Sequence, residues 1–176
     1  MALFEAGKLA KLTGSALSVA GYRNQANGFD PRSGEGARRF GSRFNAPHSF
    51  PVVYLCTSRP CVVAELTRQA DRQGLAIDDL LPRELWRITA EFTKVLDLTH
   101  HGTLEALAVD PADLLRDDRQ LTNEIGEAAH EHRFQAIRSA SVTGVDDVLA
   151  VMPENLAGAV LLVELIQEWT TASDLG

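Results

Sequence analysis

Apolar and polar residues alternate most clearly in residues 85–92 (LWRITAEF), where from Trp86 onward every second residue is apolar. This period of two is typical of a half-buried β-strand. Residues 51–56 (PVVYLC) are rich in β-branched and aromatic residues, which also favours a strand. Further strands are expected at 95–98, 134–139, 147–152 and 159–165. The last of these apolar segments is equally compatible with a buried helix.

Helical segments are expected between these strands. In residues 61–73 (CVVAELTRQADRQ) a helix is indicated by Ser58 as N-cap, Pro60 in the first turn and Gly74 as a stop. Other helical segments are expected at 103–108, 111–116 and 120–133. Because the elements are mixed without regular βαβ alternation, the pattern predicts a single α+β domain over residues 1–176. Its central sheet should be mixed, partly antiparallel and flanked by helices.

Length and composition place the chain among soluble globular proteins. It has 176 residues, of which 45% are hydrophobic and 23% charged, so it can bury a core without disulfides or metals. Residues 1–21 only faintly resemble a signal peptide, because Glu5 and two lysines interrupt the apolar part. Two cysteines, Cys56 and Cys61, cannot form a disulfide framework. We therefore expect a cytoplasmic protein that does not enter a membrane.

The charge is unevenly distributed. The formal net charge is −7, yet residues 22–43 carry five arginines against two acidic residues. An acidic chain lacks the basic face that nucleic acid needs, so direct nucleic-acid binding is not expected. Residues 33–45 (SGEGARRFGSRFN) match neither a P-loop nor a GxGxxG fingerprint. Arginine forks and glycines could still form a site for a small anion. From charge alone, a solvated basic loop is equally compatible.

The sequence offers few other candidates for catalytic or metal-binding residues. Glu65 lies on the predicted helix beside apolar residues, but periodicity alone does not show whether it points inward. His130 and His132 stand two residues apart on a predicted helix and so face different directions, and His100 and His101 are adjacent in a loop. Without a metal-binding motif, we expect no metal site.

Four features in order resemble one family. Tyr22–Arg23, the stretch SGEGARRFGSRFN, the segment PVVYLCTS and Glu65 together are similar to the RES domain, a family of small bacterial toxins named for an Arg, a Glu and a Ser. The similarity is densest over residues 22–66. It implies a fold related to ADP-ribosyltransferases and cleavage of NAD between nicotinamide and ribose. Cleavage would be by phosphorolysis or by hydrolysis. NAD is then the substrate, not a cofactor, and inorganic phosphate is a possible co-substrate.

The resemblance also implies partners and site residues. Such toxins are typically neutralised by an Xre-type antitoxin that covers the NAD pocket, and the family suggests a homodimer. Arg23 and Arg43 match the positions expected to line the pocket and hold the pyrophosphate, which neighbouring glycines would let the backbone approach. Tyr54 is a candidate for stacking on the substrate or for hydrogen bonding to it. Glu65 matches the family acid, expected to stabilise positive charge on the ribose.

The family serine has two candidates. Ser139, in Arg138–Ser139–Ala140, is the nearest match and would orient a ribose or phosphate group, while Ser141 competes with it. The sequence departs from the family pattern in that Arg138 replaces a proline and Phe44 stands where Trp is frequent. Two other functions remain open: an ADP-ribosyltransferase that modifies a macromolecule, and a non-catalytic anion-binding module.

Overall fold

The computed structural model describes residues 4–176. The strands in this range are β1 (Ser15–Gln25), β2 (Val53–Cys56), β3 (Arg83–Asp97), β4 (Ala136–Ala140), β5 (Asp147–Val151) and β6 (Leu162–Trp169). The α-helices are α1 (Ala6–Leu9), α2 (Glu35–Phe40), α3 (Arg59–Gln73), α4 (Ile77–Leu80), α5 (His101–Leu107) and α6 (Gln120–Glu131). Short 3₁₀ helices are η1 (Pro111–Leu115), η2 (Pro153–Asn155) and η3 (Ala172–Leu175).

The strands form one sheet that closes on itself. Their order is β1-β2-β5-β4-β3-β6, and β1 also pairs with β3, so that β1, β2, β5, β4 and β3 make a ring. The pairing of β3 with β4 is parallel, and the other pairings are antiparallel. The expected α+β fold with a mixed, partly antiparallel sheet is therefore confirmed. The closure of the sheet into a ring was not expected.

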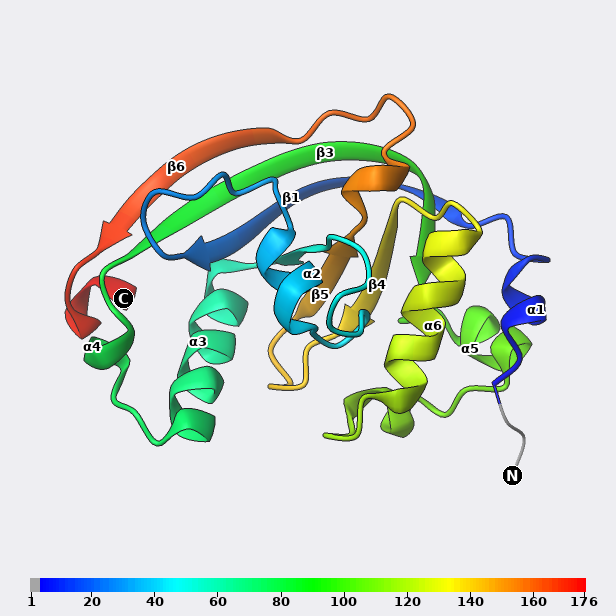
Figure 1. Cartoon of the computed structure of the whole chain (residues 1–176), viewed down its shortest axis with the longest axis horizontal. Coiled ribbons are helices and arrows are strands. Elements are labelled where there is room, and N and C mark those ends of the chain that lie inside the picture. The colour runs from blue at the N-terminus through cyan, green and yellow to red at the C-terminus, as the bar shows by residue number, and fades with distance from the viewer. Residues whose placement is uncertain (1–3) are drawn as a thin grey trace.

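Strand β3 pairs with three other strands of this sheet, β1, β4 and β6. It is one continuous strand of 15 residues, whereas the sequence predicted two pieces, 85–92 and 95–98. One edge of β3 pairs with β1; the other pairs with β6 in its first half and with β4 at Val95–Asp97. In Figure 1, β1, β3 and β6 form a long arch, and α3 and α6 descend below its two ends with α2 between them.

The structure agrees with the sequence most closely at α3. The Ser58 hydroxyl accepts a hydrogen bond from the Cys61 amide at 3.2 Å, and Gly74 ends the helix with a φ of 66°. The ambiguous segment 159–165 is resolved as a strand, because β6 (Leu162–Trp169) completes hydrogen bonds along β3. It begins and ends later in the chain than the sequence predicted.

The sequence analysis did not predict several elements, among them strand β1, helix α2 and the short helices α1 and α4. Strand β1 contains mostly small or polar residues (SALSVAGYRNQ), and it is held by pairing with β3 over most of its length. One of its small residues, Gly21, allows close packing, because a Cβ there would lie 3.0 Å from the Leu55 side chain. Helix α2 (Glu35–Phe40) forms inside the Gly/Arg stretch, for which no helix was predicted.

A large core cluster anchors the segment that follows α2. Phe44 is fully buried in this cluster together with Ile125 of α6, Phe134 and Ile137. This packing fixes the backbone of neighbouring Arg43 between α2 and α6. Among residues 4–176, no helix combines the length and the apolar character needed to cross a membrane.

Candidate functional site

Four of the five site residues predicted from sequence line one cavity. The cavity has a volume of about 260 Å³ and receives Arg23 from β1, Tyr54 from β2, Glu65 from α3, and Arg43 from the segment after α2. The fifth residue, Ser139, does not line it. The cavity therefore combines a carboxylate, several guanidinium groups and an aromatic ring, which suits a substrate that carries phosphate groups and develops positive charge.

Arg23 is an unsatisfied cation at this site. Among the described residues, its Nε is buried and has no hydrogen-bond partner. Burial lowers the pKa of Arg23 to about 10, and the nearby charge of Arg83 contributes. At neutral pH the side chain thus remains charged, and an anion would supply the missing acceptor.

Arg43 makes a hydrogen bond within the protein and lies near charged side chains of both signs. Its guanidinium donates a hydrogen bond to the carbonyl of Leu114. Burial lowers the pKa of Arg43 below its usual value, and the positive charges of Arg119 and Arg68 lower it further, while Glu65 opposes this shift. The charges of Arg119 and Arg68 are thus unfavourable for Arg43, and a bound anion would offset this repulsion.

Tyr54 has its hydroxyl occupied within the protein. The hydroxyl donates to Asn45 Oδ1 at 2.8 Å and accepts from the Phe44 amide at 2.9 Å. Asn45 in turn donates to the Ala37 carbonyl at 2.7 Å, which ties α2 to the site. Burial raises the pKa of Tyr54 above its usual value, so the phenol stays protonated. Of the two roles expected for Tyr54, contact through the ring is favoured over a hydrogen bond from the hydroxyl.

Glu65 is oriented by a serine, and that serine is Ser141. The Ser141 hydroxyl donates to Glu65 Oε1 at 2.7 Å, and it also lies 2.7 Å from the Thr143 hydroxyl. Ser139, the nearer match by sequence, is buried, and its hydroxyl reaches the Ala140 carbonyl at 3.5 Å. The structure thus brings Ser141 to the carboxylate and leaves Ser139 in the sheet.

The glycines of the Gly/Arg stretch have structural roles. Gly34 has a φ of 65°, and a Cβ there would lie 2.8 Å from the Val52 backbone. Gly41 has a φ of 73°, and a Cβ would lie 2.7 Å from Pro47. Both positions need glycine for chain conformation and packing. The expected close approach of the backbone to a substrate is therefore not required to explain these two glycines.

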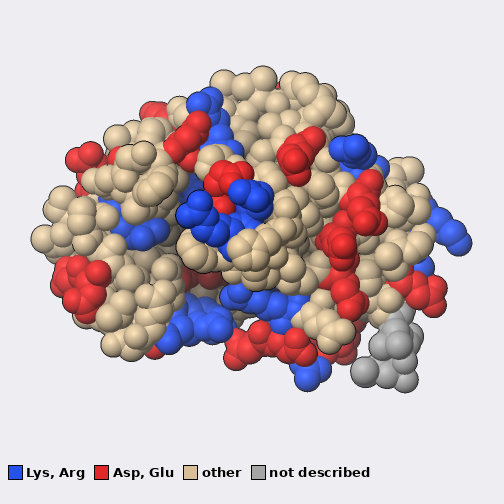
Figure 2. All heavy atoms as spheres, viewed as in Figure 1, with Lys and Arg blue, Asp and Glu red and all other residues tan. Residues whose placement is uncertain are grey.

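Three further arginines line the cavity, and the sequence analysis missed them. Arg68 and Arg72 follow Glu65 on α3, and Arg119 directly precedes α6. The spacing of Arg68 and Arg72 from Glu65 (i+3 and i+7) places them on one helix face, a signal present in the sequence. Figure 2 shows the face of the molecule that is seen in Figure 1. Lys and Arg side chains gather near the middle of that face, and a column of acidic side chains lies over α6.

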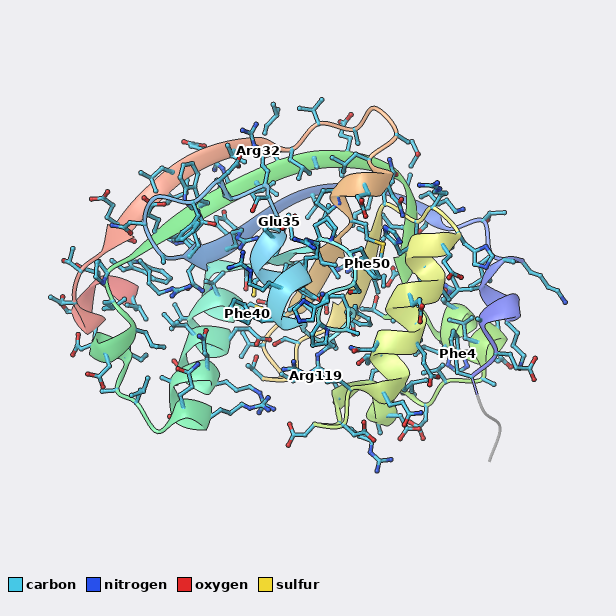
Figure 3. All side chains as sticks on the ribbon, in the orientation of Figure 1. Phe4, Arg32, Glu35, Phe40, Phe50 and Arg119 are labelled. Atoms are coloured by element: carbon cyan, nitrogen blue, oxygen red, sulfur yellow. The ribbon has the colours of Figure 1, made fainter. Side chains whose placement is uncertain are left out.

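A second cavity adjoins the first. It has a volume of about 670 Å³ and shares Arg23, Ser42 and Tyr54 with the first cavity. Phe29 and Phe40 also line it, with exposed fractions of 67% and 76%. Figure 3 shows Phe40 on α2, in front of the sheet. Within residues 4–176, the His, Cys, Asp and Glu side chains form no group that could hold a metal ion.

Comparison with known proteins identifies relatives. The family model of the RES domain matches residues 19–174. The protein named NAD(+) phosphorylase MbcT from Mycobacterium bovis is 33% identical over 126 residues, which cover 70% of this chain and 68% of the relative. The protein of the same name from Mycobacterium tuberculosis matches with the same identity and coverage.

A solved structure shares the fold. The chain is similar to one in the crystal structure of the M. tuberculosis MbcT–MbcA toxin–antitoxin complex, with a TM-score of 0.77 and 27% sequence identity. The similarity covers 93% of this chain and 90% of that chain. It therefore extends over nearly the whole fold.

Proposed function

Because the chain belongs to the RES domain family, we propose that it is an NAD phosphorylase and acts as the toxin of a toxin–antitoxin pair. The observation that carries this proposal is the shared cavity of Glu65, Arg23, Arg43 and Tyr54. The similar mycobacterial proteins are named NAD(+) phosphorylases, and one occurs in a toxin–antitoxin complex. The kinship of the fold to ADP-ribosyltransferases stays a prediction.

We place NAD across both cavities. The first cavity, at about 260 Å³, lies below the roughly 300–1,000 Å³ typical of ligand pockets, whereas the adjoining cavity adds about 670 Å³. Arg23 lines both, so it lies where the pyrophosphate would cross between them. The nicotinamide ribose then lies beside Glu65, and the adenosine half lies in the second cavity with Phe29 and Phe40.

The proposed reaction breaks the bond between nicotinamide and the ribose carbon. Nicotinamide leaves with the bonding electron pair as a neutral base, so it needs no general acid. Positive charge develops on the ribose, and the Glu65 carboxylate stabilises it electrostatically. Ser141 holds the carboxylate in place through its 2.7 Å hydrogen bond. A phosphate oxygen then bonds to the same ribose carbon, giving nicotinamide and ADP-ribose 1″-phosphate.

We also propose that a protein antitoxin binds this chain. The support is the similarity to the toxin–antitoxin complex over 93% of the chain. An antitoxin that covered the cavity would exclude NAD and so block its consumption. The Xre type of the antitoxin and the formation of a homodimer, both implied by the family resemblance, stay predictions.

The proposed activity is tested by incubating the purified chain with NAD, with and without inorganic phosphate. We expect nicotinamide release that depends on phosphate, with ADP-ribose 1″-phosphate as the second product. Both products are identified by chromatography and mass spectrometry. Release that ignores phosphate and yields ADP-ribose would indicate hydrolysis instead. A folded, partner-free chain that leaves NAD intact would contradict the proposal.

The two serines should differ in a direct comparison. Ser141→Ala removes the hydrogen bond to Glu65 Oε1. We expect kcat to fall by about ten-fold, the usual effect of losing a hydrogen bond to a charged group. Ser139→Ala is the matched control, because among the described residues its hydroxyl donates only to the Ala140 carbonyl, which is outside the cavity lining, and kcat should change by less than about two-fold. A larger loss in Ser139→Ala than in Ser141→Ala, with both variants folded, would restore Ser139 as the family serine.

A further inference from the structure

The first cavity contains more positive charge than the dinucleotide alone would use. Its lining includes five arginines, Arg23, Arg43, Arg68, Arg72 and Arg119, and one carboxylate, Glu65. NAD brings one pyrophosphate, and Arg23 and Arg43 suffice to hold it. Its nicotinamide ring is itself cationic. The positive charge of the remaining arginines is more than Glu65 and one pyrophosphate balance within the cavity, so a second anion would be stabilised there.

Two of the extra arginines come from different helical segments beside the cavity. Arg68 lies on α3, one helical turn after Glu65, and Arg119 lies at the start of α6. Figure 3 shows Arg119 in the space between α3 and α6, below α2. Both cations lie near enough to Arg43 to lower the pKa of that group. An anion between Arg68 and Arg119 would therefore lie next to the Glu65 carboxylate and the ribose carbon beside it.

An exposed carboxylate already binds one of these arginines. Asp117 Oδ1 lies 3.0 Å from Arg68 Nη2 and 3.9 Å from Arg72 Nη1. The Asp117 side chain is 78% exposed, so it is free to move away. Such an exposed ion pair contributes little to stability. The Arg68 guanidinium therefore already donates to one exposed oxyanion, and a phosphate that binds Arg68 would compete with Asp117 for it.

We propose that Arg68 and Arg119 form the site for the attacking inorganic phosphate, separate from the pyrophosphate contacts of Arg23 and Arg43. This inference rests on the proposed phosphorylase function. Two guanidinium groups suit a tetrahedral phosphate, because each can donate two parallel hydrogen bonds. The phosphate oxygen forms the new bond to the ribose carbon as nicotinamide leaves with its electron pair. A chain that holds phosphate here would favour phosphorolysis over hydrolysis.

The test measures KM for phosphate and KM for NAD separately in Arg68→Gln and Arg119→Gln. We expect KM for phosphate to rise by about ten-fold or more in each variant, as for the loss of a charge-assisted hydrogen bond, while KM for NAD changes by less than about three-fold. Asp117→Asn should lower KM for phosphate, because it removes the competing carboxylate. Arg116→Gln is the matched control, since Arg116 pairs with Asp113 and lies outside the cavity lining.

A binding measurement separates this inference from the proposed function. Isothermal titration of inorganic phosphate into the wild-type chain should show binding that Arg68→Gln and Arg119→Gln remove and that Arg116→Gln keeps. If the wild type binds phosphate at this site but releases no nicotinamide, the proposed function fails and the anion site stands. If phosphate binding is equal in all variants, or if KM for NAD rises instead, the inference is overturned and these arginines bind the dinucleotide.

Discussion

Glu65→Gln is expected to lower kcat for nicotinamide release from NAD by about 10²–10³-fold, while KM for NAD stays within a few-fold of the wild type. The substitution keeps the size and shape of the side chain and removes only its negative charge. The amide oxygen can still accept the hydrogen bond from Ser141, which the carboxylate accepts at 2.7 Å. The loss should therefore appear in the chemical step, where positive charge develops, and not in binding.

The control for this prediction lies on the same helix. Asp71 is an exposed carboxylate of α3 outside the cavity lining, so Asp71→Asn makes an equal change of charge without touching the site. We expect Asp71→Asn to retain the wild-type kcat. Both variants should show the thermal unfolding temperature of the wild type. Undiminished turnover in a folded Glu65→Gln protein would exclude this carboxylate from the reaction.

The site could be predicted from sequence where its residues belong to local motifs. Arg23, Arg43, Tyr54 and Glu65 all fall within residues 22–66, and β1, β2 and α3 bring them to one cavity. The α3 boundaries were also predictable, because Ser58 and Gly74 carry the cap signals within the chain itself. Such signals need no knowledge of distant pairings.

The contacts that were missed depend on pairings between distant segments. Ser141 meets Glu65 across a separation of 76 residues, which only the completed ring of strands brings together. Arg119 joins the cavity because α6 packs beside the segment of Phe44, again a distant contact. Strand β1 is stabilised mainly by its partner β3, so its own sequence shows little alternation. Local periodicity contains no information on any of these three contacts.

One of these distant contacts leads to the largest expected effect on stability. Gly126 lies in the middle of α6, and a Cβ there would come within 1.7 Å of the Phe44 carbonyl oxygen. Gly126→Ala should therefore push α6 away from the buried segment that positions Arg43. We expect the free energy of unfolding to fall by about 3 kcal/mol or more, at or beyond the upper end of overpacking effects. For a chain of this size, that lowers the unfolding temperature by roughly 6–12 °C.

Gly36→Ala provides the matched control, because Gly36 is also helical and a Cβ there would meet nothing within 4 Å. Alanine is the better helix former by about 1 kcal/mol, so Gly36→Ala should leave stability unchanged or raise it slightly. Thermal unfolding followed by circular dichroism measures both variants. An unfolding temperature of Gly126→Ala at or above that of the wild type would show that α6 can move without loss. The contact between Gly126 and Phe44 would then not be what holds Arg43, and with it the anion site, in place.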